Sequence, residues 1–476
     1  MTLTPGLGCG IEHIVVLMFE NRSFDNILGT LYPRTHTFGD YTFEGLPLDS
    51  SNLDAAGKPQ TVWTESPPQL DDTAMCTPSP DPGERFQNVN LQLFGKTFPE
   101  GTAASALGTA AMGGFVVDYA LKKATGDIGS GGLKWPKLPR GHGDAVGRDI
   151  MHYFSQTQVP VSTALAQQYA VCDHWFASVA TQTFANRMFA HAASSAGGVD
   201  DFEILEQHLI EGYDIPTVFQ AIDEQQNGTS WRIYYDKQAG SYSISEMLLR
   251  YVHDRRDDDQ RLRDFSPHFA ADVKAGLPSY TFIEPNYGHK LLTPKSDHPN
   301  SYHPPYNVHD GERLLWSVYN TLKTANPEAW KKTLLIVTFD EHGGCYDHVS
   351  PPAVPAAQAG AAPFDRFGVR VPTMLISPQI APGTIYRADS GSLDHTSILR
   401  TVFDCFLGED VSLHARDKHA PSVASVLTKG EDNPGVTVAP TLPPTVYSEA
   451  DLARISAHGN HLAEMNELRR GQGSDT

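Results

Sequence analysis

The feature that most constrains the fold is a set of short apolar runs, rich in branched residues, that alternate with longer segments of helical periodicity. Runs of this length and composition are typical of buried strands. Two helices are predicted, one over residues 311–324, where apolar residues recur at helical spacing, and one over 397–406. The alternation predicts an α/β fold with a mostly parallel sheet flanked by helices. The clearest strand candidates are Ile14–Phe19, Arg232–Tyr235, Tyr280–Ile283, Leu334–Phe339 and Pro372–Ile376.

The chain has 476 residues, which is enough to bury a large core. We predict one α/β catalytic domain over residues 1–435, with long loop insertions, and a linker and C-terminal helix or tail over 436–476. Two Pro/Gly/Ser-rich regions, 45–82 and 349–363, are predicted to be loops. Long loops in a compact enzyme more often shape a site than separate domains.

The charge of the chain narrows the classes of partner. There are 36 Lys and Arg residues against 56 Asp and Glu, a formal net charge of −20. A surface this acidic disfavours broad contacts with a phosphate backbone, so no nucleic-acid partner is expected. An anionic substrate would need a local cation, either a metal ion or a small Arg/His cluster.

The cysteines, the apolar segments and the first residues bear on the cellular compartment in which the protein works. Five widely spaced cysteines without a CxxC pair suggest neither a disulfide framework nor a thiolate zinc site. No apolar stretch approaches the roughly 18–20 residues of a membrane span. The first residues lack the basic start and cleavage region of a secretory leader. A cytoplasmic protein, export without a leader, and a leader already removed all remain open.

Polar side chains directly follow two of the predicted strands. Glu20 and Asn21 come after the run that ends at Phe19, and Asp340 and Glu341 come after the run that ends at Phe339. Ligand sites of parallel sheets lie beyond the carboxyl ends of the strands, where two such pairs can meet. Carboxylate and amide oxygens suit a divalent cation. The alternative for the first pair is an ordinary helix start capped by a polar side chain.

Two further segments carry groups suited to phosphoryl transfer. TQTFANR, residues 181–187, combines hydroxyls with Asn186 and Arg187, and a metal ion can lower the pKa of a hydroxyl while the other two hold anionic oxygens. His303, before Pro304 and Pro305, can protonate a leaving alkoxide. The alternatives are helix capping for the first segment and a solvated loop histidine for the second. Together with the acidic pairs, these residues satisfy the requirements of metal-assisted phosphate-ester cleavage.

The order of several motifs makes a resemblance specific. ENRSFDNILG, DPGERFQNVNLQLFG, TQTFANR, HPPYNVHDGE, FDEHGGCYDHVSPP and DHTSILRTVF occur between about Ile11 and Leu407. The chain therefore resembles the phosphoesterase family of bacterial phospholipases C, bacterial acid phosphatases and plant non-specific phospholipases C, within the alkaline phosphatase superfamily. The resemblance implies a large α/β core and a covalent phospho-enzyme intermediate on a Ser or Thr.

Matched by motif, the resemblance assigns roles to individual residues. Thr183 is implied as the nucleophile, and His303 as a residue that contacts the phosphate and assists proton transfer. One departure is Glu84, because many relatives place a histidine after DPG; a carboxylate there would orient another group or contact a cationic headgroup. The implied metal ligands are Glu20, Asn21, Thr183, Asp340 and Glu341, and the implied substrate-binding residues are Asn186, Arg187, Glu84 and His348.

The resulting expectation is a metal-dependent phospholipase C that hydrolyses the glycerol-side phosphodiester of phosphatidylcholine-like lipids through a phosphothreonine. Transient contact with a membrane surface would accompany such a substrate, and the resemblance suggests secretion. The alternatives are an acid phosphatase acting on phosphomonoesters and an inactive lipid- or headgroup-binding protein. An oxygen-rich site accepts calcium, magnesium, manganese or zinc, so the sequence leaves the metal open.

Overall fold

The computed structural model describes residues 9–70, 72–125, 146–201, 203–204, 211–225, 228–237, 242–288, 298–428 and 432–445. At its centre is an eight-stranded sheet of order β12-β6-β11-β10-β1-β9-β7-β8. Neighbouring strands are parallel except at β11, which runs antiparallel to β10 and β6. All five predicted strands belong to this sheet, so the mostly parallel α/β prediction is confirmed. The strands are β1 (His13–Phe19), β6 (Ala170–Val171), β7 (Trp231–Tyr235), β8 (Leu262–Asp264), β9 (Tyr280–Ile283), β10 (Thr333–Phe339), β11 (Met374–Ile376) and β12 (Thr384–Ile385).

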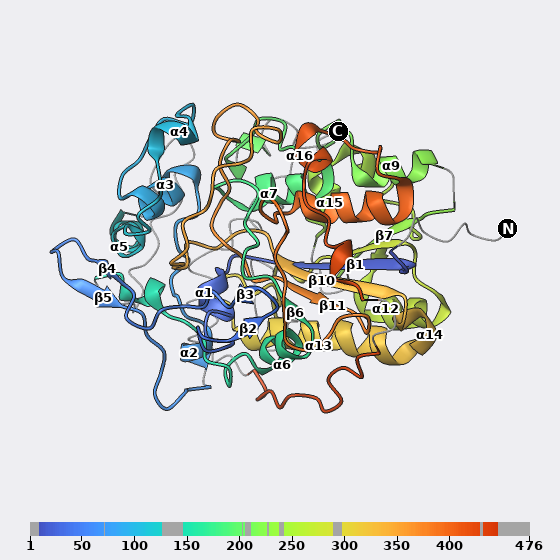
Figure 1. The fold of residues 1–476 in the computed structure, drawn as a ribbon, viewed down its shortest axis with the longest axis horizontal. Coiled ribbons are helices and arrows are strands. Elements are labelled where there is room, and N and C mark those ends of the chain that lie inside the picture. The colour runs from blue at the N-terminus through green and yellow to red at the C-terminus, as the bar shows by residue number, and fades with distance from the viewer. Residues whose placement is uncertain are drawn as a thin grey trace, which may run out of the picture.

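Helices cover both faces of the sheet (Figure 1). Strand β10 is buried along its whole length, as expected for a strand covered on both faces. The helix predicted over 311–324 lies within α13, and the one predicted over 397–406 is divided between α15 and a π-helical turn, Phe403–Leu407. One layer holds α7 (Thr183–Ala192), α9 (Val218–Gln225), α10 (Ile244–Leu248) and α15 (Thr396–Val402). The other holds α6 (Pro160–Gln168), α12 (Phe265–Ala275), α13 (Val308–Ala325) and α14 (Pro327–Trp330).

A group of short elements lies beyond the end of the sheet toward which β1 runs, at the left of Figure 1. The predicted loop 45–82 contains the β4–β5 hairpin and α2, whereas 349–363 has no helix or strand. These elements therefore stand over the edge of the sheet where the predicted site residues begin. They are β4 (Ser51–Leu53), β5 (Pro59–Thr61), α2 (Asp72–Met75), α3 (Phe86–Phe94), α4 (Ala104–Leu107) and α5 (Phe115–Thr125).

The remaining elements are short. They are α1 (Phe24–Ile27), the hairpin β2 (Thr37–Phe38) and β3 (Tyr41–Thr42), α11 (Arg250–His253), α16 (Ala415–Lys418), and two 3-10 turns at Arg148–Met151 and Ala424–Val426.

Two contacts hold segments near the ends of the described residues against the core. Cys9 forms a disulfide with Cys405, 396 residues away in sequence. The absence of a disulfide framework in the cysteine pattern did not anticipate this one pair, because spacing along the chain says nothing about such a long-range contact. Residues 436–445 have no regular structure and lie along α13, where the Val436 amide donates to Tyr319 Oη at 2.8 Å. The C-terminal helix or tail predicted within 436–476 lies outside the described residues beyond 445, and the domain boundary at 435 stays a prediction.

Candidate active site

The Glu20–Asn21 pair and the Asp340–Glu341 pair meet because the strands that precede them are neighbours in the sheet. Phe19 pairs with Phe339 across β1 and β10, so the residue after each strand lies at the same edge. The Asn21 amide donates to Asp340 Oδ1 at 3.1 Å. Glu20, Asn21, Asp340 and Glu341 are all fully buried. The structure thus brings together four of the five predicted metal ligands from two segments more than 300 residues apart.

The glycine pair after Glu341 allows this close approach. Gly343 and Gly344 both have left-handed backbone conformations, with φ of 61° and 65°. A Cβ atom on Gly343 would lie 2.1 Å from the Asn21 carbonyl oxygen, and one on Gly344 would lie 2.7 Å from Pro82 Cβ. Only glycine therefore fits at these two positions, where the loop after β10 packs between the segment after β1 and the DPG segment.

Helix α7 adds the predicted nucleophile to this edge. Thr183 is the first residue of the helix and Arg187 follows one turn later, so both side chains lie on the same face. Arg187 Nε donates to Asp340 Oδ2 at 3.0 Å, and its Nη2 lies 4.0 Å from Glu20 Oε1. Within the described residues, neither Thr183 Oγ1 nor Arg187 Nη1 has a hydrogen-bond partner, although both are buried. A hydroxyl and a cationic donor are therefore left available beside the carboxylates.

Asn186 uses its side chain differently from what was predicted for a phosphate ligand. Its Oδ1 accepts from the Val179 amide at 3.1 Å, and its Nδ2 lies within 3.0–3.2 Å of the Val179, Thr181 and Gln182 carbonyl oxygens. These bonds hold the loop that leads into α7. A direct contact with substrate stays a prediction, while the observed contacts indicate that Asn186 positions Thr183.

Asp201 is a residue near the site that the sequence did not single out. Its Oδ1 accepts from the Phe184 amide at 2.8 Å, directly after Thr183. Its charge also raises the pKa of Glu20 and of Glu341. No predicted strand precedes Asp201, so the only signal was a pair of acids in a loop, which is common on protein surfaces.

Burial dominates the electrostatics of the site. It raises the pKa of Glu20 well above its usual value, with Arg187 opposing and Asp340 reinforcing the shift. It raises the pKa of Glu341 in the same way, and Asp340 again adds to the effect. Burial alone would lower the pKa of Arg187, but Tyr287, Asp340 and Glu20 outweigh it and raise that pKa. Several buried carboxylates thus share one guanidinium, an arrangement that a further cation would stabilise.

The oxygen atoms that have no partner fit a divalent cation. Within the described part of the chain, no hydrogen bond reaches either carboxylate oxygen of Glu20, Asn21 Oδ1, Thr183 Oγ1 or Glu341 Oε1. Such oxygens are the ligands that hard and borderline cations prefer. Asp340 is different, because it accepts from the Asn21 and Glu341 amides and from Arg187, which uses three of about four acceptor positions of a carboxylate. Its ligand role stays a prediction.

His303 lies between two acidic side chains at the same edge. Its Nδ1 is 2.6 Å from the Pro304 carbonyl oxygen and 3.8 Å from Asp81 Oδ1, and its Nε2 is 3.8 Å from Glu84 Oε1. His303 lowers the pKa of Asp340, which places its charge close to the acidic pairs. The pKa of Glu84 is raised well above its usual value by burial and by Asp81 and Glu341. His303, Glu84 and Asp81 therefore lie together in the buried site, while the roles predicted for His303 and Glu84 stay predictions.

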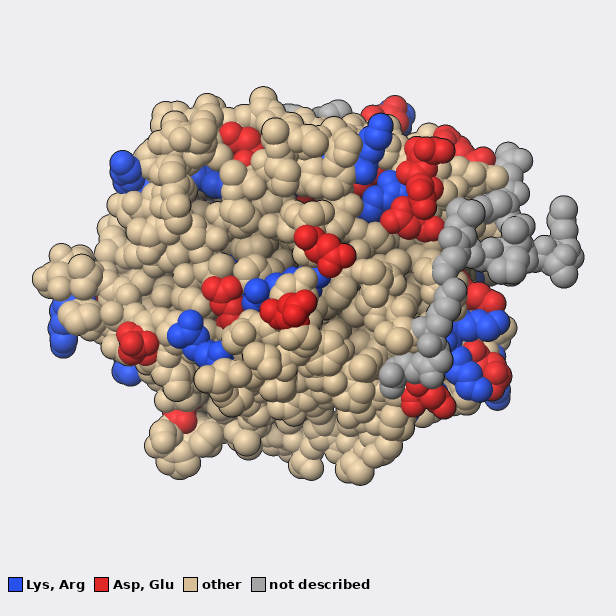
Figure 2. Space-filling view, in the orientation of Figure 1, with Lys and Arg blue, Asp and Glu red and all other residues tan. Residues whose placement is uncertain are grey.

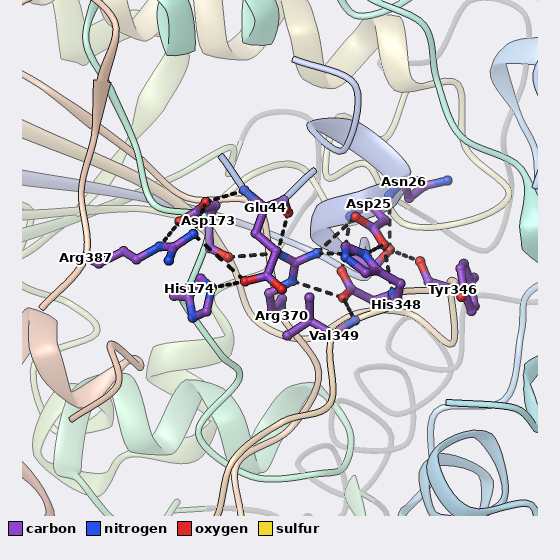
Figure 3. A network of polar contacts seen from close by, with 12 residues as sticks. Asp25, Asn26, Glu44, Asp173, His174, Tyr346, His348, Val349, Arg370 and Arg387 are labelled. Atoms are coloured by element: carbon purple, nitrogen blue, oxygen red, sulfur yellow. Dashed lines mark hydrogen bonds and ion pairs between the residues drawn. The ribbon is translucent and has the colours of Figure 1, made fainter. Parts of the chain in front are cut away.

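His348 lies in a separate network around Arg370, shown in Figure 3. His348 Nδ1 is 2.7 Å from Asp25 Oδ2, and Arg370 pairs with Asp25 and with Asp347, each at 3.0 Å. Burial raises the pKa of Asp347 to about 6, with Arg370 opposing the shift. The recorded contacts of His348 are with these residues, so its contact with substrate stays a prediction.

A buried hydroxyl beside carboxylates and a guanidinium, at the carboxyl edge of a mostly parallel sheet, is typical of α/β enzymes that cleave phosphate esters. Residues 11–407 match the Phosphoesterase family, and the chain belongs to that family. It is a hydrolase, as the motifs predicted.

Relatives of known name span most of the chain. Non-specific phospholipase C4 of Arabidopsis thaliana is 31% identical over 472 residues, which cover 96% of this chain and 78% of the relative. Phospholipase C A of Mycobacterium tuberculosis (strain ATCC 25618 / H37Rv) is 28% identical over 434 residues, which cover 84% and 73%. Among solved structures, a protein in the alkaline phosphatase superfamily from Vibrio parahaemolyticus matches with a TM-score of 0.32 and 13% identity, covering 66% of this chain and 81% of that one.

The surface adds two observations. On the face in Figure 2, Lys and Arg side chains lie in small groups beside Asp and Glu rather than in a continuous basic surface. None of the helices in the described part of the chain has the length and apolar composition that crossing a membrane requires.

Proposed function

We propose that the chain is a metal-dependent phospholipase C that cleaves the glycerol-side phosphodiester of phosphatidylcholine-like lipids through a phosphothreonine at Thr183. The observation that carries the proposal is the buried Thr183 hydroxyl, which has no hydrogen-bond partner within the described residues and lies one helical turn from Arg187. A buried hydroxyl without a partner is costly to keep, which is the expected state of a group that meets substrate or metal. The names of the relatives from Arabidopsis and Mycobacterium support the choice of a phospholipase C.

The residues of the site divide the reaction between them. A divalent cation bound by Glu20, Asn21, Thr183 and the Asp340–Glu341 pair would lower the pKa of the Thr183 hydroxyl and neutralise charge on the phosphoryl oxygens. Thr183 Oγ1 gives its proton to water and attacks phosphorus, and the Nη1 group of Arg187, which has no partner in the described residues, donates to a phosphoryl oxygen.

The remaining steps need a proton donor and water. His303 gives a proton to the diacylglycerol oxygen as the bond from that oxygen to phosphorus breaks. Water then cleaves the phosphothreonine and releases the phosphorylated headgroup. Asn186 takes no proton in these steps; its hydrogen bonds to the loop before α7 fix the position of Thr183.

The first test removes the nucleophile. Thr183→Ala should lower phosphocholine release from phosphatidylcholine by about 1,000-fold or more, because the covalent route is lost. Thr281→Ala is the matched control, since Thr281 is also a buried threonine whose hydroxyl has no partner in the described residues, but it lies in β9. Near-wild-type release by Thr183→Ala would contradict the proposed nucleophile.

The runner-up is an acid phosphatase acting on phosphomonoesters, which would use the same groups. Measuring inorganic phosphate release from a simple phosphomonoester beside phosphocholine release separates the two. Phosphate release that depends on Thr183, without headgroup release, would leave the site chemistry standing and overturn the lipid substrate.

A further inference from the structure

Asp81, Glu84 and His303 form a compact group of possible metal ligands, called here the Glu84 cluster. One ligand atom from each side chain lies within 4.8 Å of the others. The exposed fractions of the three residues are 8%, 3% and 2%, so water does not solvate the group freely.

The inner oxygens of both acids lack hydrogen bonds. Within the described residues, neither Asp81 Oδ1 nor Glu84 Oε1 accepts a hydrogen bond. The outer oxygen of Asp81, Oδ2, lies 3.7 Å from Lys122 Nζ, which also donates to the Pro82 carbonyl oxygen at 2.6 Å. One lysine thus faces the outside of the cluster, and the two inner oxygens are left toward His303. Buried carboxylate oxygens in this state are strongly favoured to bind a cation.

His303 presents its Nε2 lone pair toward Glu84, while Asp81 Oδ1 lies 3.8 Å from Nδ1 of the same ring. Its Nδ1 is 2.6 Å from the Pro304 carbonyl oxygen, and because a carbonyl only accepts, Nδ1 carries a proton. In the neutral ring the lone pair is therefore on Nε2, which faces Glu84 Oε1 at 3.8 Å, too far for a direct hydrogen bond. Donor atoms about 2.0–2.2 Å from a zinc ion lie about 3.4 Å apart in a tetrahedral site, so a small side-chain shift would suffice.

We infer that the Glu84 cluster is a second divalent cation site, selective for zinc-like ions, and that an ion bound there inhibits the enzyme. The donor set of one imidazole and two carboxylates suits Zn²⁺, whereas the site at Glu20 and Asp340 offers oxygen atoms alone and suits harder ions. An ion on Nε2 takes the lone pair that must hold the proton for the leaving oxygen. The binding part stands on the geometry of the cluster, while the inhibition part rests on the proposed function.

The test measures zinc binding on the full-length enzyme in excess Mg²⁺, which occupies the oxygen site. Equilibrium dialysis followed by elemental analysis should give one tightly bound Zn²⁺ per chain. Glu84→Gln, and Asp81→Asn as a second variant, should weaken that binding by about 10–100-fold or more, as loss of a ligand or of its support does. His348→Gln is the matched control, because its cluster also has two carboxylates and one histidine but already contains Arg370. It should bind Zn²⁺ as the wild type does.

Activity provides the second readout, expressed for each protein relative to its own zinc-free rate. Zn²⁺ should suppress phosphocholine release by the wild type, and Glu84→Gln should lose this sensitivity. Glu20→Gln should still bind one Zn²⁺, which separates the two sites. Equal Zn²⁺ affinity in the wild type and both cluster variants would overturn the site. Binding that depends on Glu84 but leaves the rate unchanged would overturn the inhibition, and no headgroup release from any protein would instead contradict the proposed phospholipase activity.

Discussion

Two groups in this molecule each contain two carboxylates and one histidine but differ in the charge that they leave uncompensated. Asp25, Asp347 and His348 surround Arg370, which forms two ion pairs of 3.0 Å. In the part of the chain that the structure describes, the lysine or arginine that pairs with the Glu84 cluster is Lys122, 3.7 Å from the outer oxygen of Asp81. Two carboxylates and a histidine therefore do not define a metal site by themselves; the deciding feature is whether a protein cation already lies among them.

Arg370 also ties together segments that are distant in sequence. Besides its two acid partners, it donates from Nη1 to the carbonyl oxygens of Glu44 and Asp173, at 3.0 and 2.8 Å. A guanidinium with all its groups bound in this way is structural rather than available to substrate. The network of Figure 3 is thus the completed counterpart of the Glu84 cluster.

The largest change in stability is expected when the network around Arg370 loses its cation. Arg370→Met should lower the free energy of unfolding by about 3–5 kcal/mol, because it leaves buried carboxylates without their cation. Urea or guanidinium denaturation measures the change. Glu84→Gln, assayed without added metal, should cost less than Arg370→Met, because burial already raises the pKa of Glu84 and no lysine or arginine of the described residues forms an ion pair with it. A larger loss for Glu84→Gln than for Arg370→Met would reverse the comparison.

A smaller effect sharpens the contrast at the Glu84 cluster. Lys122→Met removes the cation that pairs with Asp81 and should tighten Zn²⁺ binding by about 10-fold or more, since even at the dielectric constant of water a positive charge about 6 Å away opposes a divalent ion by about 1.4 kcal/mol. The same dialysis measurement reports it. Unchanged affinity would show that the charge of Lys122 is screened from the cluster.

The smallest change in stability is expected at Glu44 and His174, which lie at the partly exposed side of the Arg370 network. A hydrogen bond from His174 is the main cause that lowers the pKa of Glu44 to about 2. A depressed carboxyl pKa contributes stability that is complete above the unfolded pKa of about 4.5 and is lost as pH falls toward 2. Because Glu44 is partly exposed, Glu44→Gln should cost only about 0.5–1 kcal/mol at pH 7 after solvent screening. Denaturation of both proteins between pH 2 and 7 should show the difference vanish at the acid end; a difference that persists at pH 2 would contradict this cause.

Sequence reasoning worked where a local pattern carried the information. The strand candidates at Leu334–Phe339 and Tyr280–Ile283 became β10 and β9 because runs of branched apolar residues favour buried strands whatever surrounds them. It failed where a partner was remote. Asp201 and Asp81 lie in loops without a strand before them, and the Cys9–Cys405 disulfide joins the two ends of the fold. The phosphate contact expected of Asn186 did not anticipate its bonds to the preceding loop.

By itself, the sequence determined that Glu20 and Asn21, and Asp340 and Glu341, directly follow buried strands, because hydrophobic periodicity is a local property. Only the tertiary structure decided that β1 and β10 are neighbours in matching register, so that the two pairs share one edge. It also decided that Arg370 lies among one group of acids and not the other. Ion pairing in a buried site depends on distances of a few ångströms between residues hundreds of positions apart, and those distances exist only once the chain has folded.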